Sequence, residues 1–266
     1  MRLQDKVVII TGGGTGIGKA IATVFAAEGA SVVVAGRNIN TLSAVIEQIE
    51  YKRGKGIAIV ADVSNEAQIK NLVQQTIAKY GQIDVLVNNH THTPSLDAAV
   101  ADMPVDYWTK GLEVNLTGTM MLTKEVIKQM IPRRTGSIVN ISSVAGITPD
   151  PYHSAYATSK WGIIGFTASL AGEVGQYNIR ANCVSPAGTL TEGFQTGMAA
   201  LAKQKGMTSD AFMNKMMQSY ALKRLVKPSE VATAALFLAS DDASAVTGQN
   251  LIVSCGFQVL HPGMVG

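Results

Sequence analysis

Hydrophobic residues follow two alternating patterns along this chain. Short apolar runs rich in β-branched residues recur, and several are apolar at almost every position, which is typical of strands buried on both faces of a parallel sheet. Strands are predicted at residues 7–11, 31–35, 56–61, 83–88, 136–141, 178–184 and 250–253. Between them, apolar residues at helical spacing predict helices at residues 17–27, 41–51, 66–80 and 117–130, and a further helix opens at Pro228.

This alternation of strands and helices predicts the α/β class. Successive strand–helix–strand units build a doubly wound sheet, here of seven parallel strands with helices on both faces. The sequence contains no long linker, internal repeat or low-complexity tract. We therefore expect a single domain over residues 1–266.

Residues 191–225 interrupt this rhythm, because no strand is predicted in them. The segment holds five methionines: Met198, Met207, Met213, Met216 and Met217. It could be an extra helical pair packed on the core, or an adaptable cover over a substrate. Ligands of doubly wound sheets bind at the carboxyl ends of the strands, and this segment leaves such an end. We therefore favour a substrate lid.

The composition agrees with a buried sheet. Charged residues make up 15% of the chain, below the usual ~25%, and 47% of residues are hydrophobic. The net charge of +3 is too small to indicate a nucleic-acid partner. The N-terminal residues lack the apolar region of a signal peptide, and no apolar run reaches the ~18 residues of a membrane span. We expect a cytoplasmic protein with no membrane partner.

A glycine-rich turn lies between the first predicted strand and the first predicted helix, with Gly12, Gly16 and Gly18 in it. Glycines allow the backbone to approach a pyrophosphate, and a helix N-terminus stabilises its negative charge. The turn also approaches a nucleotide P-loop, but Ala20 stands where that motif places the Ser or Thr that holds Mg²⁺. A dinucleotide is therefore expected in preference to a nucleoside triphosphate.

The end of the second predicted strand indicates which dinucleotide binds. NAD enzymes place a carboxylate there for the adenosine ribose hydroxyls, whereas this chain has Arg37 and no acid beside it. Because an arginine can pair with a 2′-phosphate, NADP(H) is favoured over NAD(H). Asp62, after the third strand, could accept from the adenine amino group. Asn88 and Asn89, at the end of the fourth, could line the adenine side.

Three residues farther along the chain carry acid–base chemistry. Lys160 follows Tyr156 by four residues, and Ser143 precedes Tyr156 by thirteen. Residues four apart share one helix face, and an ammonium there is expected to lower the pKa of the phenol from about 10. Tyr51 and Lys55 have the same spacing, but no serine motif precedes them. Tyr156 is therefore the candidate proton donor and acceptor.

Together these motifs resemble the short-chain dehydrogenases/reductases, in their single-domain branch, over nearly the whole chain. The resemblance implies a Rossmann fold and assigns cofactor, adenine, catalytic and nicotinamide-side positions. The cofactor turn matches at Gly12, Thr15, Gly16, Ile17 and Gly18, the adenine contact at Asp62 and Val63, the paired asparagines at Asn88 and Asn89, the catalytic set at Asn115, Ser143, Tyr156 and Lys160, and the nicotinamide-side loop at Pro186, Thr189 and Thr191.

The chain departs from the family pattern at three places. His90 and Thr91 replace Ala-Gly after Asn89, Ala187 replaces the glycine after Pro186, and residues 253–256 replace an Asp-Gly-Gly motif. None of these changes removes a catalytic group. The first places larger side chains beside the cofactor, and the second adds a methyl near the nicotinamide.

The resemblance also implies roles. Tyr156 acts as general acid in reduction and general base in oxidation, while Lys160 lowers its pKa and binds the nicotinamide ribose. Ser143 hydrogen-bonds and polarises the substrate oxygen. Asn115 holds a water that links Lys160 to solvent. Hydride transfer itself belongs to the cofactor.

These observations favour an NADP(H)-dependent oxidoreductase that interconverts a carbonyl and a secondary alcohol. Its substrate is expected to be apolar, either a 3-oxoacyl thioester or a bulky ketone. The alternative is a non-catalytic NADP-binding regulator. His90 and His92 could form a metal pair, but no third ligand is evident, so no metal is expected. The family's assembly implies a homotetramer with residues 113–130 and 156–174 between subunits.

Overall fold

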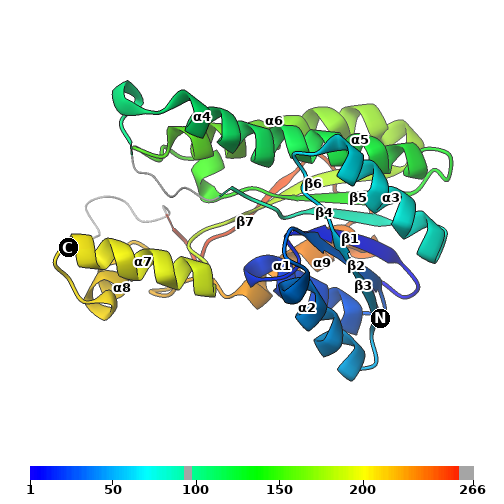
Figure 1. Ribbon diagram of the computed structural model, residues 1–266, viewed down its shortest axis with the longest axis horizontal. Coiled ribbons are helices and arrows are strands. Elements are labelled where there is room, and N and C mark those ends of the chain that lie inside the picture. The colour runs from blue at the N-terminus through cyan, green and yellow to red at the C-terminus, as the bar shows by residue number, and fades with distance from the viewer. Residues whose placement is uncertain (93–97, 258–266) are drawn as a thin grey trace.

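A computed structural model describes residues 1–92 and 98–257, and these form a sheet of seven parallel strands (Figure 1). The strand order is β3-β2-β1-β4-β5-β6-β7. The strands are β1 (Val7–Thr11), β2 (Ser31–Gly36), β3 (Lys55–Val60), β4 (Val85–Asn88), β5 (Gly136–Ile141), β6 (Ile179–Pro186) and β7 (Asn250–Val253). The order changes direction between β1 and β4, and the carboxyl edge at such a point is where doubly wound sheets bind ligands.

Helices cover both faces of the sheet, which confirms the doubly wound prediction (Figure 1). One layer holds α1 (Gly16–Ala27), α2 (Ile39–Tyr51) and α9 (Pro228–Ala239). The other holds α3 (Glu66–Tyr80), α5 (Gly118–Met130) and α6 (Ser154–Val174). Over the described ranges, no helix is both long and apolar enough to cross a bilayer.

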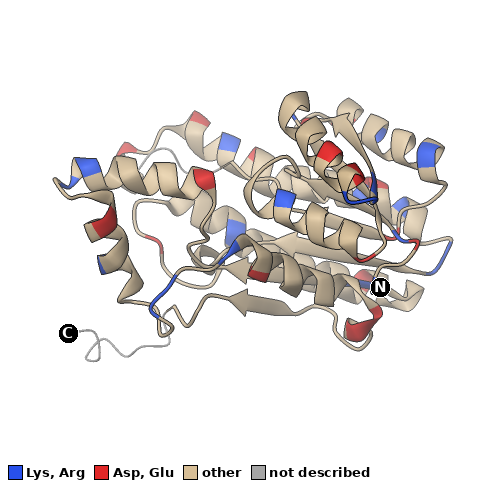
Figure 2. Cartoon of the chain, turned by 90° about the horizontal axis from the view of Figure 1, so that it is seen from below, with Lys and Arg blue, Asp and Glu red and all other residues tan. Residues whose placement is uncertain are grey.

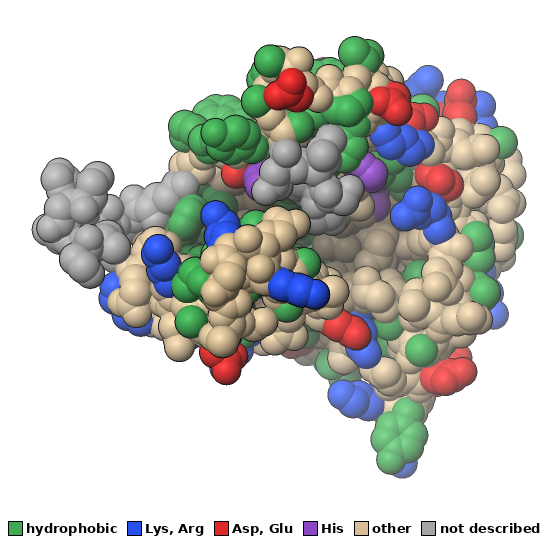
Figure 3. Space-filling view, turned by 60° about the vertical axis from the view of Figure 1, so that its left-hand side comes forward, with side chains coloured by type: hydrophobic (Ala, Val, Ile, Leu, Met, Phe, Trp, Pro, Cys, Tyr) green, Lys and Arg blue, Asp and Glu red, His purple; other side chains and the backbone are tan. Residues whose placement is uncertain are grey.

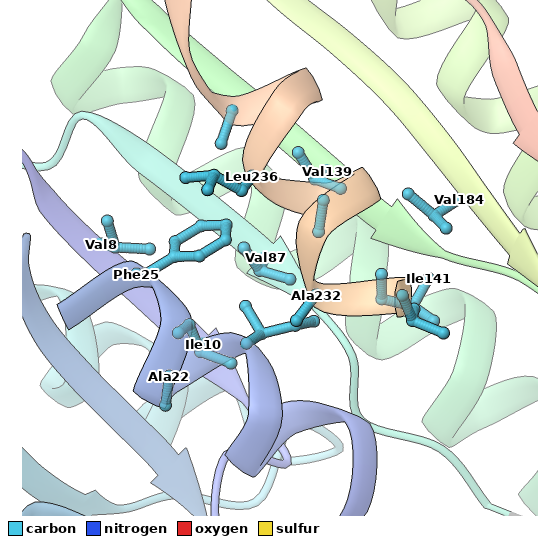
Figure 4. Packing of buried hydrophobic residues seen from close by; sticks show 14 of the residues in the cluster. Val8, Ile10, Ala22, Phe25, Val87, Val139, Ile141, Val184, Ala232 and Leu236 are labelled. Carbon is cyan, nitrogen blue, oxygen red and sulfur yellow. The ribbon is translucent and has the colours of Figure 1, made fainter. Parts of the chain in front are cut away.

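Alternating side chains of the central strands supply the two hydrophobic cores. In β1, Val8 and Ile10 pack with Phe25 of α1 and Leu236 of α9, whereas Ile9 belongs to the cluster on the opposite face (Figure 4). Because successive side chains of a strand point to opposite faces, a fully apolar run serves both layers. Each such buried side chain stabilises the fold by about 1.5–3 kcal/mol.

Several strand boundaries differ from the predictions, by one residue in β2 and β3 and by up to two residues in β4 and β6, because pairing rather than composition sets them. β4 begins at Val85, because its pairing with Val8 of β1 begins there, and not at the predicted residue 83. Just before it, Asp84 accepts a hydrogen bond from the Val7 amide at 2.8 Å and pairs with Arg133 at 2.6 Å. β6 runs on to Pro186, because β7 pairs with it up to that residue.

The helix predicted at residues 117–130 is in fact the end of a longer helical run. α4 (Val105–Leu112) continues through a π-helical turn, Glu113–Thr117, into α5. The Gly118 amide bonds to the Glu113 carbonyl, five residues back instead of four. A π turn adds one residue without changing the apolar composition, so an α-helical periodicity search does not detect it.

The segment predicted as a lid contains α7 (Glu192–Gln204) and α8 (Ser209–Met217), which extend from the carboxyl edge of the sheet (Figure 1). Phe194, Met213, Met216 and Met217 pack partly buried against the core. A cleft of about 400 Å³ lies between the two helices. Its lining residues are Gln195, Ala199, Ser209, Asp210, Met213, Asn214 and Met217. The helical pair is thus partly core packing, and its movement as a lid stays a prediction.

Candidate active site

The glycine turn joins β1 to the N-terminus of α1. Gly12 and Gly16 have φ angles of +61° and +52°, in the left-handed region that glycine adopts without a Cβ penalty. A Cβ on Gly18 would lie 2.5 Å from the Asn89 amide nitrogen, so no larger residue fits there. Thr15 is the N-cap, and its side chain makes no capping hydrogen bond to any described residue. The first-turn N–H groups are therefore available to an anion.

Asn89 fixes the shape of this turn. Its amide nitrogen donates to the Thr11 carbonyl at 3.0 Å and to the Gly12 carbonyl at 3.2 Å. Asn88 is buried and donates to Thr123 at 3.0 Å and to Asn140 of β5 at 2.9 Å. Both side chains thus tie structural elements together, a function that the sequence analysis did not assign to them.

A basic and an acidic side chain, Arg37 and Asp62, interact electrostatically just after the ends of β2 and β3. Arg37 follows β2 and is exposed, while Asp62 lies two residues beyond β3. Burial raises the pKa of Asp62, but hydrogen bonds from the Ser64 amide (2.9 Å) and hydroxyl (2.7 Å), together with the charges of Arg37 and Lys110, outweigh it and hold the pKa below its ordinary value. Val63 is buried behind them. An ionised acceptor and a guanidinium therefore share this part of the edge.

The hydroxyls of Ser143 and Tyr156 meet at the end of β5. Ser143 follows the strand and accepts from the Ala145 amide at 3.1 Å, which fixes its side chain. Tyr156 lies in the first turn of α6 and is half-buried. The two side chains are hydrogen-bonded to each other. The sequence prediction that these residues converge is consistent with this arrangement.

Lys160 is held by the main chain of β5. Its ammonium donates to the Ile141 carbonyl at 3.0 Å and lies 5.6 Å from the centroid of the Tyr156 ring. Burial raises the pKa of Tyr156, opposed by the Ser143 hydrogen bond and assisted by Asp150. Lys160 is not among the groups that shift the pKa of Tyr156 in this arrangement, so its lowering of that pKa stays a prediction. Burial also lowers the pKa of Lys160 itself, to about 8.

Asn115 lies fully buried in the π turn and connects two segments. Its Oδ1 accepts from the His92 amide at 2.6 Å, and its Nδ2 donates to the His92 carbonyl at 3.2 Å and to Ser159 at 3.0 Å. Ser159 in turn donates to the Tyr156 carbonyl at 2.7 Å. The amide of Asn115 is thereby fully used within the protein. Ser159 was missed by sequence reasoning, because no spacing marks a single serine inside a helix.

The loop after β6 closes the site opposite the glycine turn. Pro186 ends the strand, and the Thr189 hydroxyl donates to the Ala187 carbonyl at 2.8 Å. Thr191 caps α7 by accepting from the Phe194 amide at 3.1 Å. A Cβ on Gly16 would lie 3.2 Å from the Thr191 methyl, so the base of the lid segment touches the cofactor turn.

These elements surround a hollow at the carboxyl edge of the sheet. Figure 3 shows it between the α7–α8 lobe and the body of the molecule, with histidine side chains at its border. The structure brings the predicted catalytic residues to β5, the π turn and α6. The predicted cofactor residues lie in the segments after β1, β2, β3 and β4, at the end of β6 and the loop after it, and in α6, which carries Tyr156 and Lys160. No group of His, Cys, Asp and Glu among the described residues has the arrangement of a metal site.

Comparison with known proteins places this geometry in a family. A family model described as enoyl-(acyl carrier protein) reductase matches residues 12–258. The 3-oxoacyl-[acyl-carrier-protein] reductase FabG of Thermotoga maritima is 40% identical over 97% of this chain and all of its own. A solved actinorhodin polyketide ketoreductase with NADPH is similar at a TM-score of 0.91, with 32% identity over 97% and 99% of the two chains. NAD⁺-bound xylitol dehydrogenase reaches 0.90, with 31% identity over 95% and 99%.

The chain belongs to the short-chain dehydrogenases/reductases, as the motifs predicted. It is an enzyme of this type, an oxidoreductase that acts on carbonyl and alcohol groups.

Proposed function

We propose that the protein is an NADP(H)-dependent oxidoreductase that reduces an apolar carbonyl to a secondary alcohol, or catalyses the reverse reaction. The observation that carries this proposal is the hydrogen bond between Ser143 and Tyr156, at the same edge of the sheet as an uncapped helix N-terminus. A polarising hydroxyl, a proton donor and an anion site then lie along one edge of the sheet. We also propose that the enzyme is cytoplasmic.

The residues at the edge fit a dinucleotide. The glycine turn leaves no room for a Cβ at Gly18, and the first turn of α1 can bind the pyrophosphate. Asp62 and Val63 would contact the adenine, and Arg37 would pair with a 2′-phosphate. One related structure is described with NADPH and another with NAD⁺, so these relatives do not decide which cofactor binds. The support for NADP(H) comes from Arg37. The bound nicotinamide supplies or accepts the hydride.

The protein's own residues transfer one proton and polarise the substrate oxygen. Because burial keeps the pKa of Tyr156 above its ordinary value, the phenol is protonated at neutral pH and ready to donate to the carbonyl oxygen as it gains charge. Ser143 hydrogen-bonds and polarises that oxygen. The Lys160 ammonium, beside the Tyr156 ring, stabilises the phenolate that remains. In this scheme Asn115 positions the segment that links the π turn to α6.

The lid segment supports an apolar substrate. Its partly buried methionines can adapt to different shapes, and two of them, Met213 and Met217, border the cleft between α7 and α8. Two substrate classes suit such a cover, a bulky ketone and the acyl chain of a 3-oxoacyl thioester.

A charge imbalance favours the thioester as a specific second candidate. Residues 191–227 contain six basic and two acidic residues, although the whole chain has a net charge of only +3. Figure 2 shows basic residues on α7, on α8 and on the loop that follows them. They could attract the phosphate groups of a thioester's carrier. The relative from Thermotoga is described as acting on such a thioester.

A cofactor-oxidation assay tests the proposal. Purified protein is mixed with NADPH or NADH and a panel of aliphatic ketones, cyclic ketones and 3-oxoacyl thioesters. We expect carbonyl-dependent oxidation of NADPH, with a higher kcat/KM than for NADH. NADPH binding without turnover on any carbonyl or alcohol would favour the alternative, a non-catalytic NADP-binding regulator.

A further inference from the structure

His90 stands between the cofactor turn and the π turn, and both of its ring nitrogens are engaged. Nδ1 lies 2.7 Å from the Thr11 hydroxyl, and Nε2 lies 3.1 Å from the Val114 carbonyl. Its backbone amide also donates to the Thr11 hydroxyl, at 3.2 Å. The ring thus bridges the end of β1 to the helical run that carries Asn115.

These partners determine the tautomer of the ring. A carbonyl oxygen only accepts, so Nε2 must carry the proton that is donated to Val114. In a neutral imidazole, Nδ1 is then an acceptor, so the Thr11 hydroxyl gives its single proton to Nδ1 at 2.7 Å in preference to the Val87 carbonyl at 3.3 Å. Burial, with a smaller contribution from Lys160, lowers the pKa of His90 to about 3, against opposing effects of the Val114 hydrogen bond and Asp62. The neutral form is therefore the one present at physiological pH.

The π turn explains why Val114 offers its carbonyl to a side chain. In an α-helix, the Gly118 amide would donate to the Val114 carbonyl, four residues back. Here that amide donates to Glu113 instead. His90 Nε2 takes the place that the Gly118 amide leaves. A histidine at this position compensates for the hydrogen bond that the π turn removes.

A chain of contacts leads from this hydrogen bond to the catalytic tyrosine. Asn115 is the next residue after Val114, its amide donates to Ser159, and Ser159 donates to the Tyr156 carbonyl. Thr119 reinforces the turn by donating to the Asn115 carbonyl at 2.8 Å, and its hydroxyl lies 3.3 Å from His90 Nε2. A shift of the π turn would therefore move the support of Tyr156.

We propose that His90 is a positioning residue, whose Nε2–H holds the register of the π turn and so sets the placement of Asn115 and Tyr156. Its kinetic consequences rest on the proposed oxidoreductase function. The tautomer of His90 and its hydrogen bond to Val114 are independent of that function, so they can be tested in the protein without measuring turnover.

The first test is NMR of the full-length protein labelled with ¹⁵N-histidine. We expect one ring with a protonated Nε2 and an unprotonated Nδ1, unchanged from pH 8 to pH 5, where free imidazole titrates. His90→Gln identifies the signal by removing it. A His90 ring that titrates within this range, or that carries its proton on Nδ1, overturns the proposal even if no substrate is ever found.

The second test compares three variants by kcat, by the KM for NADPH and by melting temperature. His90→Leu keeps much of the volume but loses the hydrogen bonds, and we expect kcat to fall about ten-fold with little change in the KM for NADPH. His90→Gln, whose amide can donate to Val114 and accept from Thr11, should recover most of kcat. Thr76→Val removes a buried hydroxyl that bonds only within α3, and it controls for stability alone.

The outcomes separate positioning from packing. If His90→Leu lowers the melting temperature as Thr76→Val does but keeps kcat, His90 only packs, and the proposal is overturned. If His90→Gln is as impaired as His90→Leu, the hydrogen bond to Val114 is not the cause. If the wild type itself reduces no carbonyl with NADPH, the proposed function fails, and the NMR result alone decides the role of His90.

Discussion

At the scale of residues, Lys160 shows a conflict between stability and chemistry. The side chain is 2% exposed. Its ammonium contacts the Ile141 carbonyl and the Tyr156 ring, and neither of these groups carries a negative charge. Burying a charge without an opposite charge costs free energy, which is why the pKa of Lys160 falls to about 8. We expect this charge to stabilise the phenolate form of Tyr156 during the reaction.

Lys160→Met tests this conflict. At pH 7 the wild-type folded state carries the buried charge, so the variant should have the higher melting temperature while its kcat falls. The folded-state pKa of about 8 lies below the ordinary 10.5. Between these values the unfolded state binds the extra proton, so wild-type stability rises with pH. We expect the advantage of the variant to shrink over that range in thermal melts, and an advantage that is absent at pH 7 would contradict the account.

Arg37 is predicted to select the cofactor. Arg37→Ala should weaken NADPH binding by about 1.5–3 kcal/mol, the contribution of a hydrogen bond to a charged group, and leave NADH binding nearly unchanged. Fluorescence titration with both cofactors measures this. Lys52→Ala, which removes an exposed cation after α2, serves as the control. A wild-type preference for NADH would show that the guanidinium does not select the phosphate.

Sequence reasoning at this scale identified residues by chemical type but not by orientation. Tyr156, Ser143 and Lys160 carry distinctive chemistry at a distinctive spacing, so they were found. The direction of the Lys160 ammonium depends on the Ile141 carbonyl, which comes from a strand distant in sequence. The roles of Asn89 and Ser159 depend in the same way on Thr11 and Asn115, which only the fold brings to them.

At the scale of elements, periodicity predicted the seven strands and the helices α1, α2, α3 and α5, since each buries a regular face. It did not predict α4 or the π turn, which inserts a residue into an amphipathic helical run and shifts its hydrogen bonds. It also left the function of α7 and α8 open, because a methionine-rich helical pair has the same composition whether it packs on a core or covers a substrate.

The lid function can be measured directly. If residues 191–225 close over an apolar substrate, kcat/KM should rise along a homologous ketone series. For each added CH₂, the rise should be at most the factor that corresponds to about 0.8 kcal/mol, the contribution of one buried CH₂. Amide hydrogen exchange in α7 and α8 should slow when substrate is added, while α3 serves as an internal reference. A preference for small polar ketones, with exchange already slow in the free enzyme, would leave this segment as core packing.

At the scale of the whole molecule, two of the surfaces that carry exposed apolar residues are the α5–α6 pair and the edge strand β7. Trp161 of α6 is 52% exposed and Met120 of α5 is 40% exposed, and Leu251 and Ile252 are exposed on the edge strand β7. Large exposed side chains and an open sheet edge are features that association covers. Two self-complementary surfaces are what a tetramer with dihedral symmetry requires.

We therefore predict a homotetramer that Trp161→Glu disrupts. Light scattering at micromolar concentration should give a tetramer for the wild type and a smaller species for the variant, because the introduced charges would be buried opposite each other. Tyr51→Glu changes an exposed aromatic residue of α2, outside both surfaces, and should leave the tetramer intact. A monomeric wild type would contradict the prediction.

The central claim is that Tyr156 transfers the proton in an NADP(H)-dependent carbonyl reduction, and Tyr156→Phe tests it most directly. The variant should keep the fold and bind NADPH with wild-type affinity, both of which circular dichroism and fluorescence titration can verify. Its kcat for the best carbonyl substrate should fall by about two to four orders of magnitude, the usual contribution of a general acid. Turnover near that of the wild type, in a folded variant that binds NADPH, would contradict the mechanism.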